Sequence, residues 1–346
     1  MNKMWSPRYL LLFIVLVVAV LLPWGLSSYQ VNVLVLVCLY AVLAESWNIV
    51  GGYAGQGSFF NAAFFGVCAY ASSLLYIIYG ITPWFGMLVG TFLAVILAVG
   101  VGYLCFRFGL TGHFFFLASI GLLVAIQRTF VNIYWSAHGK PIGGAYGLWI
   151  PVVRGNSILD FQFESRIPYY YIILIVLLAE IYITYRIQKS KMGYYFRAIK
   201  DNEDAAESLG INTLKYKIIA FAISGALAAP AGTFYAQYYL FINPGTVLSD
   251  MLSIQMVVIA VIGGMGTIFG PVIGAIIVQP IMEYARVFLG AQRGIDLIVT
   301  GIIIIAIATL KPTGFIEWFE RAYNYVTKHM FVTRSEKETE HVAPRS

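Results

Sequence analysis

The sequence predicts an all-α, polytopic integral membrane protein with about ten transmembrane helices. The chain is 60% hydrophobic and only 11% charged, whereas water-soluble proteins carry about 25% charged residues. Its mean hydropathy is +0.80, and its apolar runs reach the roughly 20 residues that a helix needs to cross a bilayer. These runs are continuous and lack the alternating segments of about ten residues that form a membrane β-barrel, which favours helices.

The predicted spans are the apolar stretches of the chain. The first follows Lys3 and Arg8 but has no A-x-A cleavage site, so we expect an uncleaved span rather than a signal peptide. The eighth and ninth are interrupted by glycines and Pro271, which leaves open whether 251–290 forms two full spans or contains a broken helix. In order, the ten stretches are 8–27, 31–50, 58–79, 83–106, 114–134, 168–187, 216–240, 251–266, 267–290 and 295–311.

The basic residues orient these spans. With ten spans and the N-terminus inside the cell, 16 of the 22 Lys and Arg residues fall in cytoplasmic segments and the other 6 in outward segments. This excess agrees with the positive-inside rule, so we expect a multi-pass protein of the plasma membrane with both termini in the cytoplasm. The orientation also explains the net charge of +6, and we predict no nucleic-acid partner.

Two glycine segments, 51–58 and 263–271, occupy comparable places in the two halves of the chain. Each opens with a Gly-Gly pair on the predicted cytoplasmic side and leads into a span of small residues. Such pairs can mark repeats whose broken helices line a substrate path, or glycines that only let helices approach closely, and the sequence leaves both open. The glycines to which we assign a structural role are Gly52, Gly55, Gly263, Gly264, Gly266 and Gly270.

The segment 186–217 holds 11 of the 38 charged residues and lies between the sixth and seventh predicted spans. Within it, 202–210 is predicted to form a helix: Asn202 or Asp201 can cap its first turn, and Gly210 suits the left-handed residue that ends a helix. A helix of about two turns is marginal alone in water. Its expected small apolar face, formed by Ala205, Ala206 and Leu209, suits a groove on a soluble partner; the alternative is a solvated loop on lipid headgroups.

The same segment carries a recognisable motif. Asp204-Ala205-Ala206 followed by Gly210 resembles the E-A-A-x-x-x-G motif of ABC importer permeases, with Asp in place of Glu. The longer run 196–212 is similar to the branched-chain amino acid permeases of the LivM type. Gly52-Tyr53-Ala54-Gly55-Gln56, the glycines of 143–147, the run 262–275 and Pro312-x-Gly314 also resemble motifs of that family, in order, so that the resemblance covers roughly residues 40–315.

The resemblance implies a transport subunit that catalyses no reaction itself. It implies that the helix at 202–210 is a coupling helix, and that residues 1–315 form the permease domain, followed by a cytoplasmic tail, 316–346, with a disordered composition from about 334. The implied partners are a second homologous permease of the LivH type, two ABC ATPase subunits, an extracytoplasmic substrate-binding protein and the lipid bilayer. The implied ATPase-coupling residues are Arg197, Glu203, Asp204, Ala205, Ala206, Glu207, Leu209 and Gly210.

No cofactor or metal is expected on this chain. It has no G-x-x-x-x-G-K-[ST] loop, so ATP and Mg²⁺ are expected on the partner ATPases. The four histidines show no metal-ligand spacing, and the three cysteines lie in apolar segments, which implies no disulfide framework.

The expected substrate is a branched-chain or related hydrophobic amino acid. Polar residues within spans are costly and are candidates for function, although each can instead hydrogen-bond between helices. Departures from the family pattern, such as Asn61 after Phe59-Phe60, leave open a permease for urea, short amides or other amino acids. An ion-coupled secondary transporter and a membrane-embedded enzyme are the alternatives from other classes. The candidate pathway residues are Glu45, Asn48, Gln56, Ser58, Asn61, Gln255 and Gln279.

Overall fold

The computed structural model describes residues 16–137, 140–153, 155–288, 301–302 and 315. Within these residues, seven helical segments are long and apolar enough to cross a membrane. The described part of the first predicted span is a shorter apolar helix, Leu16–Gly25, and the tenth lies outside the described residues apart from 301–302, so the count of ten stays a prediction. The seven segments are α2 with a π-helical turn (Ser28–Tyr53), α3 (Asn61–Tyr79), α4 (Pro83–Arg107), α5 (Gly112–Asn132), α6 (Arg166–Gln188), α9 (Thr213–Tyr239) and α10 with α11 (Pro244–Gly263).

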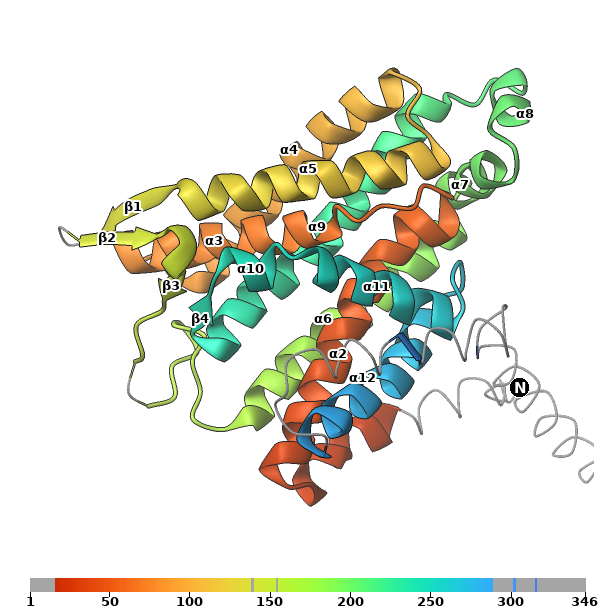
Figure 1. Cartoon of the computed structure of the whole chain (residues 1–346). Helices are drawn as coiled ribbons and strands as arrows, with labels where there is room; N and C mark the ends of the chain where they lie inside the picture. The colour runs from red at the N-terminus through yellow and green to blue at the C-terminus, as the bar shows by residue number, and fades with distance from the viewer. Residues whose placement is uncertain (1–15, 138–139, 154, 289–300, 303–314, 316–346) are drawn as a thin grey trace, which may run out of the picture.

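Helix α2, Ser28–Asn48, is the central helix of the fold, and Figure 1 shows it beside α6 and α12. A capping box starts it, in which the side chains of Ser27 and Gln30 bond each other's backbone amides. Its most apolar stretch is 89% buried, whereas that of α5 is 17% buried. A helix that is apolar on every side can be buried on every side. Helix α2 is buried in this way by the helices around it, whereas few residues of α5 are buried.

Close backbone contacts hold α3, α4 and α9 together. A Cβ added to Gly232 of α9 would lie 2.0 Å from the carbonyl oxygen of Phe65 in α3. A Cβ at Gly90 of α4 would lie 2.6 Å from Sγ and 2.8 Å from Cα of Cys68 in α3. Small residues at such crossings let membrane helices pack without a hydrophobic driving force between them. Phe64 and Phe221 stack edge to face beside this contact, with ring centres 5.1 Å apart.

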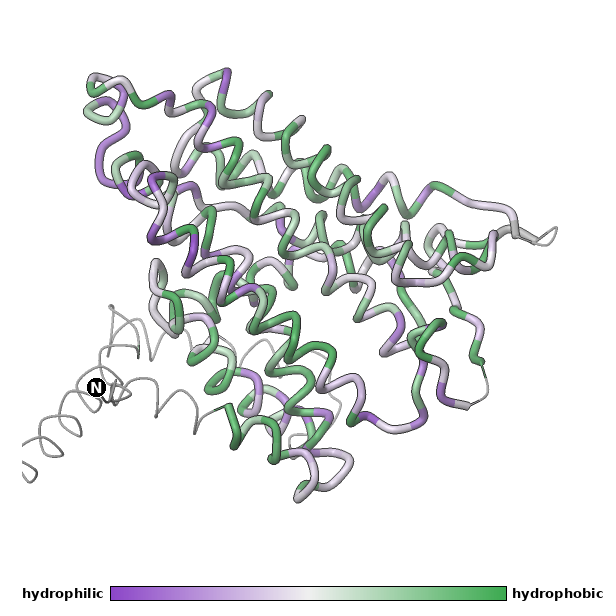
Figure 2. Tube along the Cα trace, turned by 180° about the vertical axis from the view of Figure 1, so that it is seen from behind, coloured by the Kyte–Doolittle hydropathy of each residue, from purple (hydrophilic) through white to green (hydrophobic). Residues whose placement is uncertain are grey.

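The two ends of the helical bundle differ. At one end, shown on the left in Figure 1, two small antiparallel pairs follow the helices: β1 (Tyr134–Ala137) with β2 (Lys140–Gly143), and β3 (Leu148–Trp149) with β4 (Phe241–Ile242). At the other end lie the helices α7 (Lys191–Asp201) and α8 (Glu203–Ser208). Figure 2 shows that hydrophilic residues gather at this second end, while the long helices are largely hydrophobic.

Residues 251–288 form two separate helices. Helix α10 (Pro244–Val247) precedes α11 (Asp250–Gly263), and a short loop joins α11 to α12 (Gly270–Phe288). With 14 residues, α11 is about 21 Å long at 1.5 Å per residue. It is therefore shorter than the roughly 30 Å hydrocarbon core of a bilayer, and it is not a full span by itself.

Candidate functional site

The helix predicted at 202–210 corresponds to α8, and a separate helix, α7, precedes it. Asn202 is extended, with φ −160° and ψ 111°, so it ends α7. Its side chain then accepts a hydrogen bond from the amide of Ala205, at 2.9 Å, and caps α8. Helix α8 has six residues, Glu203–Ser208, so it is one residue shorter than predicted at its start and two at its end. Gly210 follows it in the left-handed region at φ +85°, as predicted.

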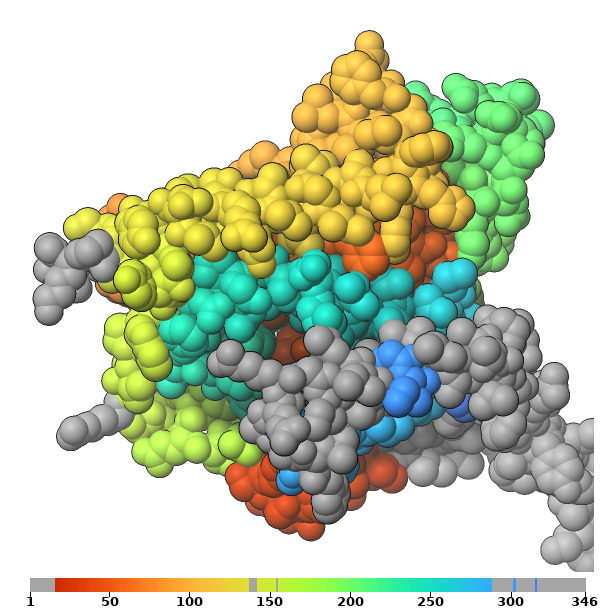
Figure 3. Space-filling view, in the orientation of Figure 1, coloured from red at the N-terminus to blue at the C-terminus, as the bar shows by residue number. Residues whose placement is uncertain are grey.

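The buried and exposed sides of α8 also differ from the prediction. Ala206 is 2% exposed and faces the protein, whereas Leu209 is 83% exposed. Asp204, Ala205 and Glu207 are exposed as well. Ala205, Ala206 and Leu209 therefore do not share one free face, because Ala206 packs against its own chain whereas Ala205 and Leu209 are exposed. Figure 3 shows this segment, in green at the upper right, projecting from the helices.

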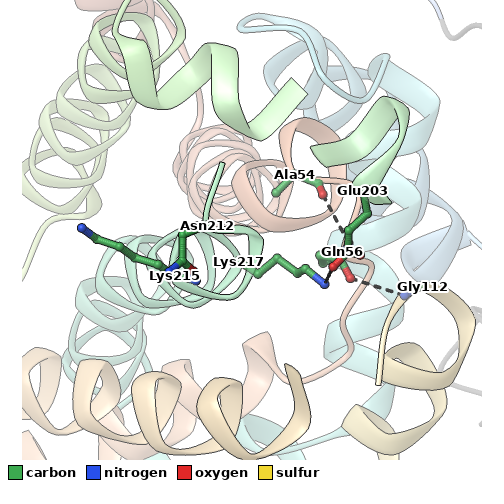
Figure 4. Close-up of polar contacts among 7 residues, drawn as sticks. All are labelled: Ala54, Gln56, Gly112, Glu203, Asn212, Lys215 and Lys217. Atoms are coloured by element: carbon green, nitrogen blue, oxygen red, sulfur yellow. Dashed lines mark hydrogen bonds and ion pairs between the residues drawn. The ribbon is translucent and has the colours of Figure 1, made fainter. Parts of the chain in front are cut away.

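An ion pair attaches α8 to the start of α9. Lys217 is 2% exposed and pairs with Glu203, and Figure 4 shows the two side chains pointing at each other while Lys215 points away. The Lys217 ammonium also lies 5.5 Å from the ring centre of Phe106. Arg197, another predicted coupling residue, donates to the carbonyl oxygen of Gln188 at 3.3 Å. A buried lysine needs a counter-charge, and this requirement is the sequence signal that could have identified Lys217.

Lys217→Met is expected to destabilise the protein, because it leaves the Glu203 carboxylate without its partner. The cost should be about 1–2 kcal/mol, below the 3–5 kcal/mol of a fully buried pair, since Glu203 is partly exposed. Thermal unfolding of the purified chain in detergent measures it. Lys215→Met is the matched control and should leave the melting temperature unchanged. The double variant Lys217→Met/Glu203→Gln should lose less than the sum of the single variants; additive losses would contradict the pairing.

Gln56 links the first glycine segment to the start of α5. Its side-chain oxygen accepts a hydrogen bond from the amide of Gly112, at 3.3 Å, and its nitrogen donates to the carbonyl oxygen of Ala54, at 3.5 Å. Figure 4 draws these contacts in the same view as the Glu203–Lys217 pair. Gln56, predicted as a pathway residue, is only 5% exposed and in this conformation holds two elements together.

The two glycine segments meet in space. Asn48 of α2 accepts a hydrogen bond from the amide of Gly266 at 2.7 Å, and donates to the carbonyl oxygen of Thr267 at 2.9 Å. A Cβ at Gly52 would lie 1.9 Å from the Asn48 side-chain oxygen and 2.6 Å from the Gly266 nitrogen. This approach therefore requires Gly52. The segments that the sequence placed in comparable positions of the two halves thus contact each other directly.

The remaining predicted glycines also sit at close contacts or unusual backbone angles. A Cβ at Gly263 would lie 1.7 Å from the carbonyl oxygen of Gly270, and one at Gly270 would lie 2.1 Å from that of Gly264. Gly264 itself has φ +121°. Together these glycines form the tight connection between α11 and α12.

Other predicted pathway residues are buried within the chain. Trp47 donates to the carbonyl oxygen of Ser58 at 2.7 Å, and Asn61 donates to the Ser224 hydroxyl at 2.8 Å; both predicted residues are fully buried. Gln279 is 2% exposed and its side-chain nitrogen has no partner among the described residues, whereas Gln255 is half-buried. The described residues do not bring these side chains together on one open surface, and pathway lining stays a prediction.

Glu45 of α2 and Glu180 of α6 are buried carboxyl groups that interact with each other. The Glu45 carboxyl lies near the side chains of Thr184 and Asn48, whereas the Glu180 carboxyl has no hydrogen-bonding partner within the described part of the chain. The sequence indicates that each glutamate lies within a span, but it gives no sign that they are neighbours. Over those same residues no group of three His, Cys, Asp or Glu side chains could hold a metal ion.

Known proteins resemble this chain over most of its length. The profile of a family described as "Branched-chain amino acid transport system / permease component" matches residues 29–308. The high-affinity branched-chain amino acid transport system permease protein LivM of Escherichia coli K12 is 24% identical over 89% of this chain and 74% of its own. LivH of Salmonella typhimurium is 25% identical over 80% of this chain and 91% of its own. The autoinducer 2 import system permease protein LsrC of Salmonella paratyphi B is 32% identical over 46% of this chain and 43% of its own. No solved structure matches.

Proposed function

The chain belongs to the family of branched-chain amino acid transport permeases, and from that premise we propose that it is the membrane subunit through which an ATP-binding cassette importer moves branched-chain or related hydrophobic amino acids into the cytoplasm. The relatives named LivM and LivH support this substrate class. The chain itself is a transport subunit, and its described helices are those of a multi-pass membrane protein.

The proposal that α8 contacts the ATPase rests on the exposed side of this helix. A helix of six residues is too short to be stable alone, and here Ala206 and the Glu203–Lys217 pair attach it to the bundle. Its free side presents the exposed apolar residues Ala205 and Leu209 together with the exposed acidic residues Asp204 and Glu207. An exposed apolar side chain within a polar rim suits a pocket on a soluble protein. The proposed occupant of that contact is the ATPase subunit of the importer.

The proposed complex contains one copy each of this chain and a second, homologous permease, two ATPase subunits and an external binding protein. ATP and Mg²⁺ are held by the ATPases, since this sequence has no phosphate-binding G-x-x-x-x-G-K-[ST] loop. The complex lies in the bacterial inner membrane with both termini of this chain, and α7 and α8, on the cytoplasmic side. Closure of the ATPase pair moves α8, and the spans follow.

Uptake into proteoliposomes tests the function. The four membrane and ATPase subunits are reconstituted with ATP inside, the binding protein is added outside, and radiolabelled leucine is the probe. We expect leucine uptake that requires ATP and all subunits. Transport of urea or a short amide without leucine would contradict the substrate class, and the likeness to LsrC makes other solutes a necessary comparison. ATP-independent uptake by this chain alone would instead establish an ion-coupled secondary transporter.

A further inference from the structure

Residues from three distant parts of the chain meet at the end of α2. The side chain of Asn48 bonds the backbone of Gly266 and Thr267, and Asn48 is fully buried. Lys200 of α7 donates from its ammonium to the carbonyl oxygen of Gly52, at 2.8 Å. A Cβ at Gly266 would also lie 3.5 Å from that ammonium. The helix α7, the end of α2 and the loop before α12 therefore share one set of hydrogen bonds.

The backbone around Lys200 is as close as its side chain. A Cβ at Gly55 would lie 2.9 Å from Cγ and 3.1 Å from Cα of Lys200, so α7 rests directly on the first glycine segment. The Gly52 carbonyl belongs to the π-helical turn Ile49–Tyr53 that ends α2. The end of a helix carries partial negative charge and attracts a cation. A hydrogen bond from an ammonium is stronger than one between neutral groups.

We propose that Asn48 and Lys200 are positioning residues that join α7, α2 and the α11–α12 loop into one joint, through which movement of the α7–α8 segment reaches the two glycine segments. This inference rests on the proposed function, since it describes how ATPase movement enters the spans. It adds a second connection between the α7–α8 segment and the spans. The Glu203–Lys217 pair connects α8 to α9. Lys200 instead connects α7 to the end of α2, where Asn48 bonds the loop before α12.

The chemistry of the joint suits movement. Its contacts are a few polar bonds to backbone atoms and close approaches at glycines, rather than interlocked apolar side chains. Interlocked side chains favour discrete packing arrangements and resist gradual displacement. The hydrogen bonds from Lys200 and Asn48 to backbone groups set the direction in which α7 would displace the loops that it contacts. Such bonds can also form again after a small shift.

Lys200→Met tests the joint in the reconstituted importer. Leucine transported per ATP hydrolysed should fall about tenfold, the loss expected from removing one charge-assisted hydrogen bond. ATP hydrolysis without binding protein should stay near wild type, and the melting temperature should fall by only the few degrees that one hydrogen bond contributes. Lys200→Arg, which keeps a cationic donor, should restore most of the ratio. Lys191→Met is the matched control, because Lys191 is an exposed lysine of the same helix, and it should behave as wild type.

Hydrogen–deuterium exchange separates transmission from folding. When the wild-type complex is trapped with ATP, amide exchange should change in both 203–210 and 262–270. In Lys200→Met the change at 203–210 should persist, and the change at 262–270 should be lost. A normal response at 262–270, or normal transport per ATP, overturns the joint, as does a fall in melting temperature that accounts for the lost transport. A wild-type complex that transports no leucine would instead count against the proposed function.

Discussion

Leu209→Asp is expected to abolish ATP-driven uptake while the chain stays folded in the membrane. Leu209 is 83% exposed, so the substitution removes little packing within this chain. Hot-spot side chains of protein interfaces commonly contribute at least about 2 kcal/mol, and a carboxylate forced into an apolar pocket adds a desolvation cost. Association with the ATPase should therefore weaken by at least about 30-fold. Co-purification of the ATPases and leucine uptake by proteoliposomes measure the effect.

The control for this prediction is Leu209→Met, which keeps an apolar side chain of similar volume and should retain uptake. Ala206→Arg is a poorer probe of the same contact, because Ala206 is buried against its own chain and the arginine would displace α8. Normal co-purification and uptake by Leu209→Asp would show that the ATPase does not contact this face of α8.

Gly263→Ala is expected to prevent stable packing of α11 against α12. The added Cβ would lie 1.7 Å from the carbonyl oxygen of Gly270 and 2.8 Å from the nitrogen of Gly274. Both are backbone atoms, so no side-chain rotation relieves the overlap and a helix must move. Overpacking costs about 1–3 kcal/mol and occasionally more, and we expect about 3 kcal/mol or more here. The yield of monomeric protein after size-exclusion chromatography and its melting temperature measure the loss.

Gly121→Ala is the matched control. A Cβ at Gly121 of α5 meets nothing within 4 Å, so this alanine should be neutral or should stabilise the helix by up to about 1 kcal/mol. If Gly263→Ala melted like Gly121→Ala, the close approach of α11 and α12 would be wrong.

The spans could be predicted because the signal for them is local. The stretch 83–106, for example, corresponds to α4, Pro83–Arg107, since about twenty consecutive apolar residues suffice to identify a membrane helix. Capping residues were equally informative: Asn202 and Gly210 do flank α8. Helix α7 was not predicted from the sequence. Asn202 was recognised as a residue that can begin a helix, but nothing in the sequence shows that another helix ends at the same residue.

The orientation of side chains could not be predicted in the same way. Which side of α8 faces inward depends on Lys217, a residue of the next span. Asn48 and Asn61 carry the same chemistry as pathway residues, and their partners Thr267 and Ser224 are 219 and 163 residues away. A polar residue in a membrane helix indicates that a partner exists, but the sequence does not identify the partner.

The central position of α2 also has a consequence for the biosynthesis of the chain. Helix α2 is made early, yet Asn48 bonds Thr267, which lies 219 residues later. At about 5–20 residues per second, those residues take roughly 11–44 s to synthesise. At the start of that interval α2, the most enclosed of the described spans, lacks α6, α9, α11 and α12, the helices that pack around it, and α12 is still missing at its end. Its polar side chains must be sheltered by the insertion machinery, by lipid headgroups or by temporary neighbours until the second glycine segment is made.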